Sequence, residues 1–231
     1  MKRFGINQDV LKIVALLLMT IDHIGTFFAA EPYSQICRYI GRASYPIFAY
    51  LLMMNLASYQ IFGKYLKRLG YFGFITFFAI VPIWVVLKKP VAFPSNILVN
   101  FWIVVAALYL YHEIEKLKKP ALLQWLLFLP VFAMAGACSV LSIYGFLGFC
   151  LSFCLYFYFY KGTFDWLALS LLFSYLINAS FMGGFVSLFT MAFLLFAVQI
   201  KTQPRYLHHW WIFYVYYPLH IVVLALIYYF V

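Results

Sequence analysis

Three polar side chains with potential for acid–base chemistry lie inside apolar stretches of the sequence. Asp22 and His23 are adjacent in one stretch, and His220 follows Pro218 in another. A carboxylate near an imidazole can hold one tautomer of the ring and raise its basicity, as general-base catalysis requires. We therefore treat Asp22, His23 and His220 as candidate catalytic residues. The alternatives are an interfacial Asp22–His23 pair that extends toward the membrane surface and a His220 that only packs and hydrogen-bonds.

Two arginines form a second candidate group. Arg38 and Arg42 are four residues apart, so they would share one face of a helical turn. Either could pair with the Asp22 carboxylate or stabilise an oxyanion. The alternative is a pair of arginines whose long side chains only reach toward the membrane surface.

A basic cluster is the third candidate group. It consists of Lys64, Lys67 and Arg68. Cations at this spacing could bind the phosphates of a nucleotide-like ligand, and they would equally bind anionic lipid. The four cysteines form no metal or redox motif, so no metal site is expected.

The composition tells which kind of protein must position these residues. Of 231 residues, 67% are apolar, 23% are aromatic and 10% are charged. A soluble domain has about 25% charged residues, and a disordered chain has low hydrophobicity, so both classes are excluded. The formal charge of +10 is spread between apolar runs and forms no basic domain, which argues against nucleic-acid binding. The chain is expected to be one integral membrane domain over residues 1–231.

About nine apolar windows are long enough for membrane-spanning helices. They are residues 10–28, 44–62, 69–87, 96–112, 121–138, 142–160, 166–181, 184–200 and 210–231. The expected fold is an all-α polytopic transmembrane bundle. An ionisable residue in the middle of a membrane helix costs at least about 2.5–3.5 kcal/mol, which makes Asp22, His23 and His220 conspicuous.

The distribution of basic residues predicts the orientation of the bundle. With a cytoplasmic N-terminus, nine spans put the C-terminus outside and divide the 16 basic residues 12 to 4 in favour of the cytoplasm. The cytoplasmic set is Lys2, Arg3, Lys12, Lys64, Lys67, Arg68, Lys116, Lys118, Lys119, Lys161, Lys201 and Arg205. The outer set is Arg38, Arg42, Lys88 and Lys89.

Three motifs in this order resemble the TraX family. They are residues 19–25 (MTIDHIG), residues 38–42 (RYIGR) running into 45–49 (YPIFA), and residues 214–220 (YVYYPLH). Residues 67–69, 96–98 and 144–145 agree more loosely. The family is similar to wider groups of polytopic membrane acyltransferases that use acyl-CoA, and its name-giving member acetylates the N-terminus of conjugative F pilin.

The resemblance implies a membrane N-acetyltransferase of the bacterial inner membrane. It would move an acetyl group from cytosolic acetyl-CoA to an amine, with the N-terminus of a pilin subunit as the expected acceptor. His23 would act as the base, Asp22 would orient it or balance its charge, and His220 would be a second base or a thioester ligand. Arg38 and Arg42 would pair with Asp22 or steady the oxyanion. The CoA phosphates would bind Lys64, Lys67 and Arg68.

Two other functions remain open from the residues alone. The protein could be a proton-coupled transporter with a relay of Asp22, His23 and His220, or an assembly factor that holds a pilin without catalysis. The enzyme could also acetylate a sugar or a lipid head group instead of a pilin.

Overall fold

The computed structural model describes residues 4–87, 96–140, 144–178, 180–201 and 211–230, and these fold almost entirely into helices. The elements are β1 (Phe4–Asn7), α1 (Gln8–Phe28), α2 (Tyr33–Gly41), α3 (Ser44–Tyr59), α4 (Phe62–Leu87), α5 (Ile97–Lys116), α6 (Ala121–Ser139), α7 (Gly145–Lys161), α8 (Phe164–Leu176), α9 (Phe181–Ala192), a π-helical turn (Phe193–Ala197), β2 (Val198–Lys201) and α10 (Ile212–Phe230). The expected all-α class is confirmed, and the apolar helices are those of a membrane protein.

A helix overlaps each of the nine apolar windows, but the helices differ in length and several extend beyond their windows. Among the described residues, four helices (α1, α5, α6 and α10) are long and apolar enough to cross a membrane. Helices α7 and α8 are apolar but shorter, with 17 and 13 residues. The count of nine full spans and the orientation of the termini therefore stay predictions. Part of the charge argument rests on Lys2, Arg3, Lys88, Lys89 and Arg205, which lie outside the described residues.

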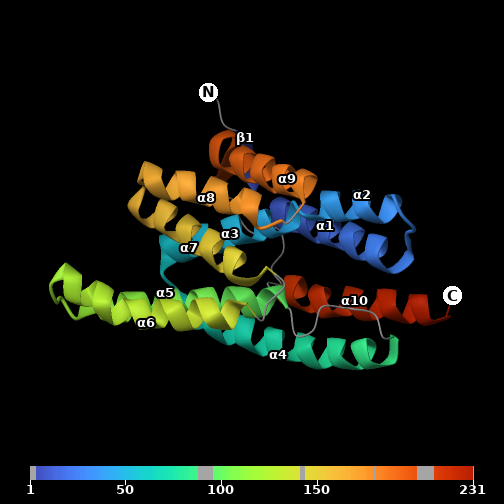
Figure 1. Ribbon diagram of the computed structural model, residues 1–231, viewed down its shortest axis with the longest axis horizontal. Helices are drawn as coiled ribbons and strands as arrows, with labels where there is room; N and C mark the ends of the chain where they lie inside the picture. The colour runs from blue at the N-terminus through green and yellow to red at the C-terminus, as the bar shows by residue number, and fades with distance from the viewer. Residues whose placement is uncertain (1–3, 88–95, 141–143, 179, 202–210, 231) are drawn as a thin grey trace.

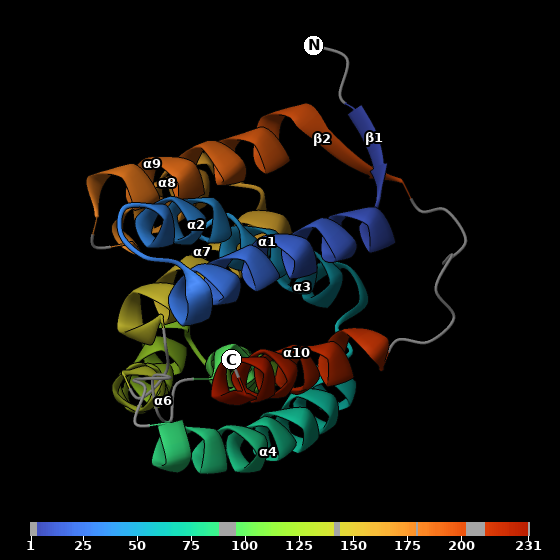
Figure 2. The same cartoon turned by 90° about the vertical axis from the view of Figure 1, so that its right-hand side faces the viewer.

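The helices form two layers along a common long axis (Figures 1 and 2). One layer contains α1, α2, α3, α7, α8 and α9, and the other contains α4, α5, α6 and α10. Polar caps fix several helix starts: the Asn7 side chain accepts a hydrogen bond from Asp9 N at 2.8 Å, and Asn96 does the same for Leu98 N at 2.9 Å. The parallel strands β1 and β2 pair Ile6 with Ile200 and join the start of α1 to the end of α9.

Helices α1 and α2 form a close hairpin that the sequence windows missed. Glycine makes the approach possible, because a Cβ on Gly41 would stand 2.3 Å from Asp22 Cβ. A Cβ on Gly25 would likewise stand 2.4 Å from Cys37 Cβ. Small residues let membrane helices approach closely enough to gain dispersion energy. The hairpin thus packs Asp22 against the last residue of α2.

Several helices begin in the middle of the molecule instead of at its ends (Figure 1). The Asn96 side chain donates to the Gly73 carbonyl oxygen at 3.0 Å, so α5 starts beside an interior turn of α4. Asn100, one turn later, donates to the Gly145 carbonyl oxygen at 3.2 Å, which places the start of α7 at nearly the same level. The Ser187 hydroxyl of α9 donates to the Arg42 carbonyl oxygen at 3.1 Å, between α2 and α3.

The helix starts around Tyr45, Asn100 and Gly148 form a middle level of the molecule, and Tyr45 connects them. Its hydroxyl lies 2.8 Å from Asn100 Oδ1, 2.9 Å from the Gly148 carbonyl oxygen and 3.1 Å from Ser152 Oγ. The ring is fully buried and stacks on Phe101 at a centroid distance of 5.2 Å. One buried hydroxyl thereby joins the starts of α3, α5 and α7. The N-terminal end of each helix carries partial positive charge, so this level favours negative charge.

Candidate functional site

Helices α1 and α10 bring two histidines into contact. His23 Nδ1 lies 3.0 Å from His220 Nε2, and the ring centroids are 4.9 Å apart. One turn earlier, Thr20 Oγ1 lies 2.8 Å from the Tyr216 hydroxyl, which fixes the same pair of helices. Residues 197 positions apart thus form one site, and the two most specific sequence motifs meet there.

A backbone carbonyl orients each histidine ring. His23 Nδ1 lies 2.9 Å from the Met19 carbonyl oxygen, and His220 Nδ1 lies 2.9 Å from the Tyr216 carbonyl oxygen. The His220 ring also stacks on Tyr216 at a centroid distance of 5.2 Å. His220 is buried, whereas His23 is half-buried and keeps part of its surface exposed. Both rings are therefore held in place, which is a requirement for a positioned base.

Asp22 faces α2 and contacts neither imidazole through a hydrogen bond. Its Oδ1 atom is buried and has no hydrogen-bond partner among the described residues. Arg42 and, to a smaller extent, Arg38 act on the carboxylate electrostatically, but in the described part of the chain neither comes within ion-pair distance of it. A buried carboxylate oxygen without a hydrogen bond is costly to maintain, so Asp22 is a candidate functional residue.

The two arginines of the second motif have different surroundings. Arg38 lies on α2 and is exposed. Arg42 caps the end of α2, is half-buried, and lies beside Tyr144 and Gly183. Arg42 therefore belongs to the middle level of the molecule, whereas Arg38 is exposed on α2.

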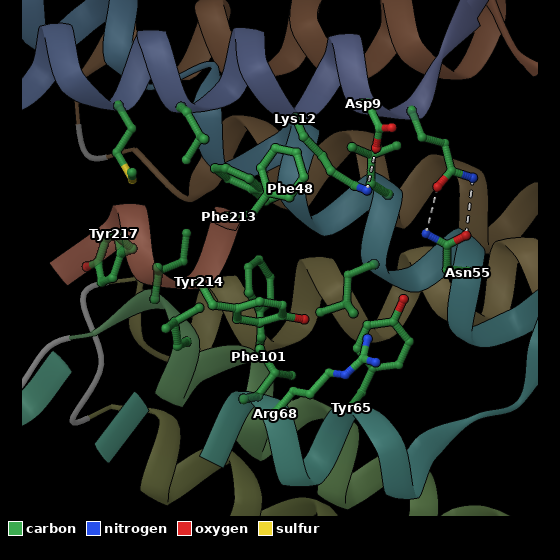
Figure 3. A pocket seen from close by; sticks show the side chains of 18 residues that line it. Asp9, Lys12, Phe48, Asn55, Tyr65, Arg68, Phe101, Phe213, Tyr214 and Tyr217 are labelled. Atoms are coloured by element: carbon green, nitrogen blue, oxygen red, sulfur yellow. Dashed lines mark hydrogen bonds and ion pairs between the residues drawn. The ribbon is translucent and has the colours of Figure 1, made fainter. Parts of the chain in front are cut away.

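A cavity of about 150 Å³ lies beside the helices that carry the two histidines, and Figure 3 shows the side chains that line it. It lies between α1, α3, α4, α5 and α10. Its lining includes Met19, whose carbonyl oxygen contacts His23, and Tyr217, one turn before His220, but neither histidine itself. Because a helix rises about 5.4 Å per turn, these two lining residues lie within about one turn of the histidines along their helices.

Polar and charged side chains gather at one end of the cavity. Lys12 forms an ion pair with Asp9 at 3.0 Å and lies over the Phe213 ring, with its Nζ atom 4.9 Å from the centroid. Arg68 reaches the cavity from the opposite wall, with Tyr214 between the two basic residues in the view of Figure 3. Both signs of charge and several aromatic rings thus line one end of a mostly apolar cavity.

The predicted basic cluster is divided between different surroundings. Arg68 lines the cavity, together with Tyr65. Lys64 borders a separate depression that also contains Lys116, and Lys67 is exposed outside both. The structure thus brings Arg68 to the cavity and leaves the two lysines away from it.

The sequence indicated Lys12 only as one of the cytoplasmic basic residues that set the orientation, although Lys12 lines the cavity opposite Arg68. Its signal was a lysine inside an apolar window, which is the same signal that singled out Asp22. The contact between Thr20 and Tyr216 had no such signal, because threonine and tyrosine are common in membrane helices. Such contacts become visible once the two helices are placed side by side.

Comparison with known proteins gives one family. The sequence model described as the TraX protein matches residues 7–228, nearly the whole chain. An uncharacterized protein of Rickettsia prowazekii (strain Madrid E) is 30% identical over 105 residues, which are 46% of this chain and 37% of that protein. The chain thus spans little more than a third of the length of this curated relative. No solved structure matches the chain.

The matched range contains every element of the site. It includes Asp22 and the His23–His220 pair, the arginine motif and all the residues that line the cavity. The likeness therefore extends over the structure that positions the site and is not confined to one motif. This chain belongs to the TraX family.

Proposed function

We propose that this protein transfers an acetyl group from acetyl-CoA to an amine at the His23–His220 pair. The observation that carries the proposal is the 3.0 Å contact between His23 Nδ1 and His220 Nε2, which joins two family motifs beside a cavity. An oriented imidazole is the commonest general base in enzymes. The proposed location is the bacterial inner membrane, with the family's link to pilin biogenesis as its setting.

The cavity is the proposed path of the donor. Lys12 and Arg68 would hold the CoA phosphates, because both cations line its polar end. From Lys12 to His23 the α1 helix rises roughly 16 Å, at 1.5 Å per residue. An extended pantetheine arm covers this span and would deliver the thioester to the imidazole. The positive-inside orientation would put the polar end of the cavity at the cytoplasm, where acetyl-CoA is made.

The acceptor is proposed to be a primary amine. The unpaired Asp22 Oδ1 atom suits the N–H groups of an amine, and it belongs to the residue next to His23. The N-terminus of a pilin subunit held in the membrane is such an amine. A sugar or a lipid head group would offer hydroxyl or amine groups as well, so both belong in the panel of acceptors.

The transfer itself needs one proton to move. The amine nitrogen attacks the thioester carbonyl carbon, and the oxyanion that forms would be stabilised by Arg42. His23 takes a proton from the attacking nitrogen. The C–S bond then breaks, the sulfur of CoA receives that proton, and the amide and free CoA thiol are the products.

A proton-coupled transporter is the second candidate, and one observation favours it. Transporters bind substrate where helices break near the middle of the membrane, and α3, α5, α7 and α9 begin near the middle of the molecule here. In that case His23 and His220 would relay protons across the bilayer. Acidification of vesicles containing the protein, in the absence of acetyl-CoA, would distinguish this function from acetyl transfer.

The direct test uses purified protein in detergent. Acetyl-CoA binding and release of free CoA thiol in the presence of a peptide amine are measured for the wild type, His23→Ala and Thr26→Ala. Thr26 is exposed and lies one turn along α1 from Asp22, so it is a matched control. We expect turnover by the wild type and Thr26→Ala and a loss of about 10²–10⁴-fold in His23→Ala. Equal turnover in His23→Ala would refute the assignment.

A further inference from the structure

We infer that His220 is a positioning residue that directs the hydrogen bonds of His23, leaving Nε2 of His23 as the one free basic nitrogen of the pair. The catalytic meaning of this inference rests on the proposed acetyl transfer. The direction of the hydrogen bonds does not, because it follows from three contacts.

The first contact fixes the tautomer of His220. A neutral imidazole has one N–H group and one nitrogen with a free lone pair. His220 Nδ1 lies 2.9 Å from the Tyr216 carbonyl oxygen, which can only accept a hydrogen bond. His220 Nδ1 therefore carries the hydrogen, and His220 Nε2 carries the lone pair.

The second and third contacts fix the tautomer of His23, and they agree. His220 Nε2 accepts, so its partner His23 Nδ1, at 3.0 Å, must donate. The Met19 carbonyl oxygen, 2.9 Å from the same nitrogen, also requires a donor there. The hydrogen on His23 Nδ1 is thus shared between His220 Nε2 and the Met19 oxygen.

The opposite direction is excluded by repulsion. If His220 Nε2 donated to His23 Nδ1, two nitrogen lone pairs would face carbonyl oxygens at 2.9 Å, one in each ring. Each contact would replace a hydrogen bond by a clash between two acceptors in a partly buried site, where unsatisfied polar groups are most costly. One arrangement of the neutral pair satisfies all three contacts.

This arrangement assigns different roles to the two histidines. His220 uses both ring nitrogens in hydrogen bonds, so neither is free to take a proton from a substrate. His23 uses only Nδ1, which leaves the lone pair of Nε2 available. When Nε2 accepts a proton, the Nδ1–H bond to His220 becomes charge-assisted and strengthens, so His220 stabilises the imidazolium of His23. The proton stays on His23 because a transfer from Nδ1 to His220 would turn a lone pair toward the Met19 oxygen.

Nitrogen-15 NMR of histidine-labelled protein in nanodiscs tests the hydrogen-bond direction without any activity. We expect both His23 and His220 to carry hydrogen on Nδ1 and not on Nε2, and a through-hydrogen-bond coupling to join His23 Nδ1 with His220 Nε2. The variants His23→Gln and His220→Gln assign the signals. A spectrum with hydrogen on Nε2 of either residue in the neutral pair would overturn the inference, whatever the outcome of the acetyl-transfer assays.

Kinetics test the role of positioning residue. His220→Leu removes the acceptor, whereas His220→Gln can place its amide oxygen near the position of Nε2. We expect kcat to fall about 10–100-fold in His220→Leu, the loss typical when a residue that orients a metal-ligating imidazole is removed, with KM for acetyl-CoA unchanged and partial recovery in His220→Gln. Thermal unfolding of both variants verifies the fold. Full activity in His220→Leu, or a loss of more than the His23→Ala loss, would contradict the role.

Discussion

Gly41 is the position where a single methyl group should disturb the site most directly. It ends α2, and its Cα faces Asp22 of α1. A Cβ at this position would lie 2.3 Å from Asp22 Cβ, 2.9 Å from Cγ and 3.1 Å from Cα. Because Cβ and Cα are fixed by the backbone, no rotation of the Asp22 side chain relieves this contact. Gly41→Ala must separate α1 from α2 at the residue beside His23.

The expected loss of stability in Gly41→Ala follows from the cost of overpacking. Forcing an extra methyl group into a packed contact costs about 1–3 kcal/mol. For a chain of this size, each kcal/mol shifts Tm by about 2–4 °C, so Gly41→Ala should lower Tm by about 2–12 °C. The displaced Asp22 should also reduce acetyl transfer at saturating acetyl-CoA. Thermal unfolding followed by intrinsic fluorescence and a thiol-release assay measure the two effects.

Gly63→Ala is the matched control. Gly63 lies in the first turn of α4, and a Cβ there would meet nothing within 4 Å. Alanine favours helix over glycine by up to about 1 kcal/mol, so Tm should stay the same or rise slightly. If Gly41→Ala and Gly63→Ala had equal Tm and equal activity, the close packing of α1 on α2 would be refuted.

Three further predictions concern the cavity and the middle level. Arg68→Gln should weaken acetyl-CoA binding about 10–100-fold in calorimetry, because it removes hydrogen bonds to a charged phosphate. Lys67→Gln should leave Kd unchanged, and a larger loss of affinity in Lys67→Gln than in Arg68→Gln would contradict the cavity as the donor site. Tyr45→Phe leaves buried acceptors unpaired and should cost about 1–3 kcal/mol, measured as a lower Tm, and an unchanged Tm would contradict the network. Ser187→Ala removes two hydrogen bonds, one to the Arg42 carbonyl oxygen and one from the buried Asn178 amide, and should cost about 1–3 kcal/mol, so an unchanged Tm would contradict these contacts.

The helices were predictable from the sequence because apolar runs of this length can only be buried as helices in a membrane. The sequence missed α2, since nine residues that include Arg38 form no apolar window. It also missed the helix starts in the middle of the molecule. A hydropathy window shows where a run of residues is apolar. The level in the molecule at which the helix begins depends on tertiary contacts, such as the hydrogen bond from Asn96 to the Gly73 carbonyl oxygen.

The candidate site was predictable as a set of residues and not as an arrangement. Asp22, His23 and His220 stood out because ionisable groups are rare in apolar helices. The contact between His23 and His220 requires α1 to pack on α10, and nothing in the local sequence specifies that pairing. The orientation of His23 by Asp22 stays a prediction. The nitrogen that contacts the His23 ring belongs to His220.

Acetyl transfer to an amine, with His23 as the base and His220 positioning it, is the proposed activity. The most direct measurement supplies acetyl-CoA with a deuterated acetyl group to proteoliposomes and analyses acceptor peptides by mass spectrometry. We expect the label on a peptide with a free N-terminus, on no peptide whose N-terminus is blocked, and on neither with His23→Ala. Folded protein that binds acetyl-CoA but labels no amine, or a His23→Ala protein that labels the free peptide as fast as the wild type, would contradict the claim.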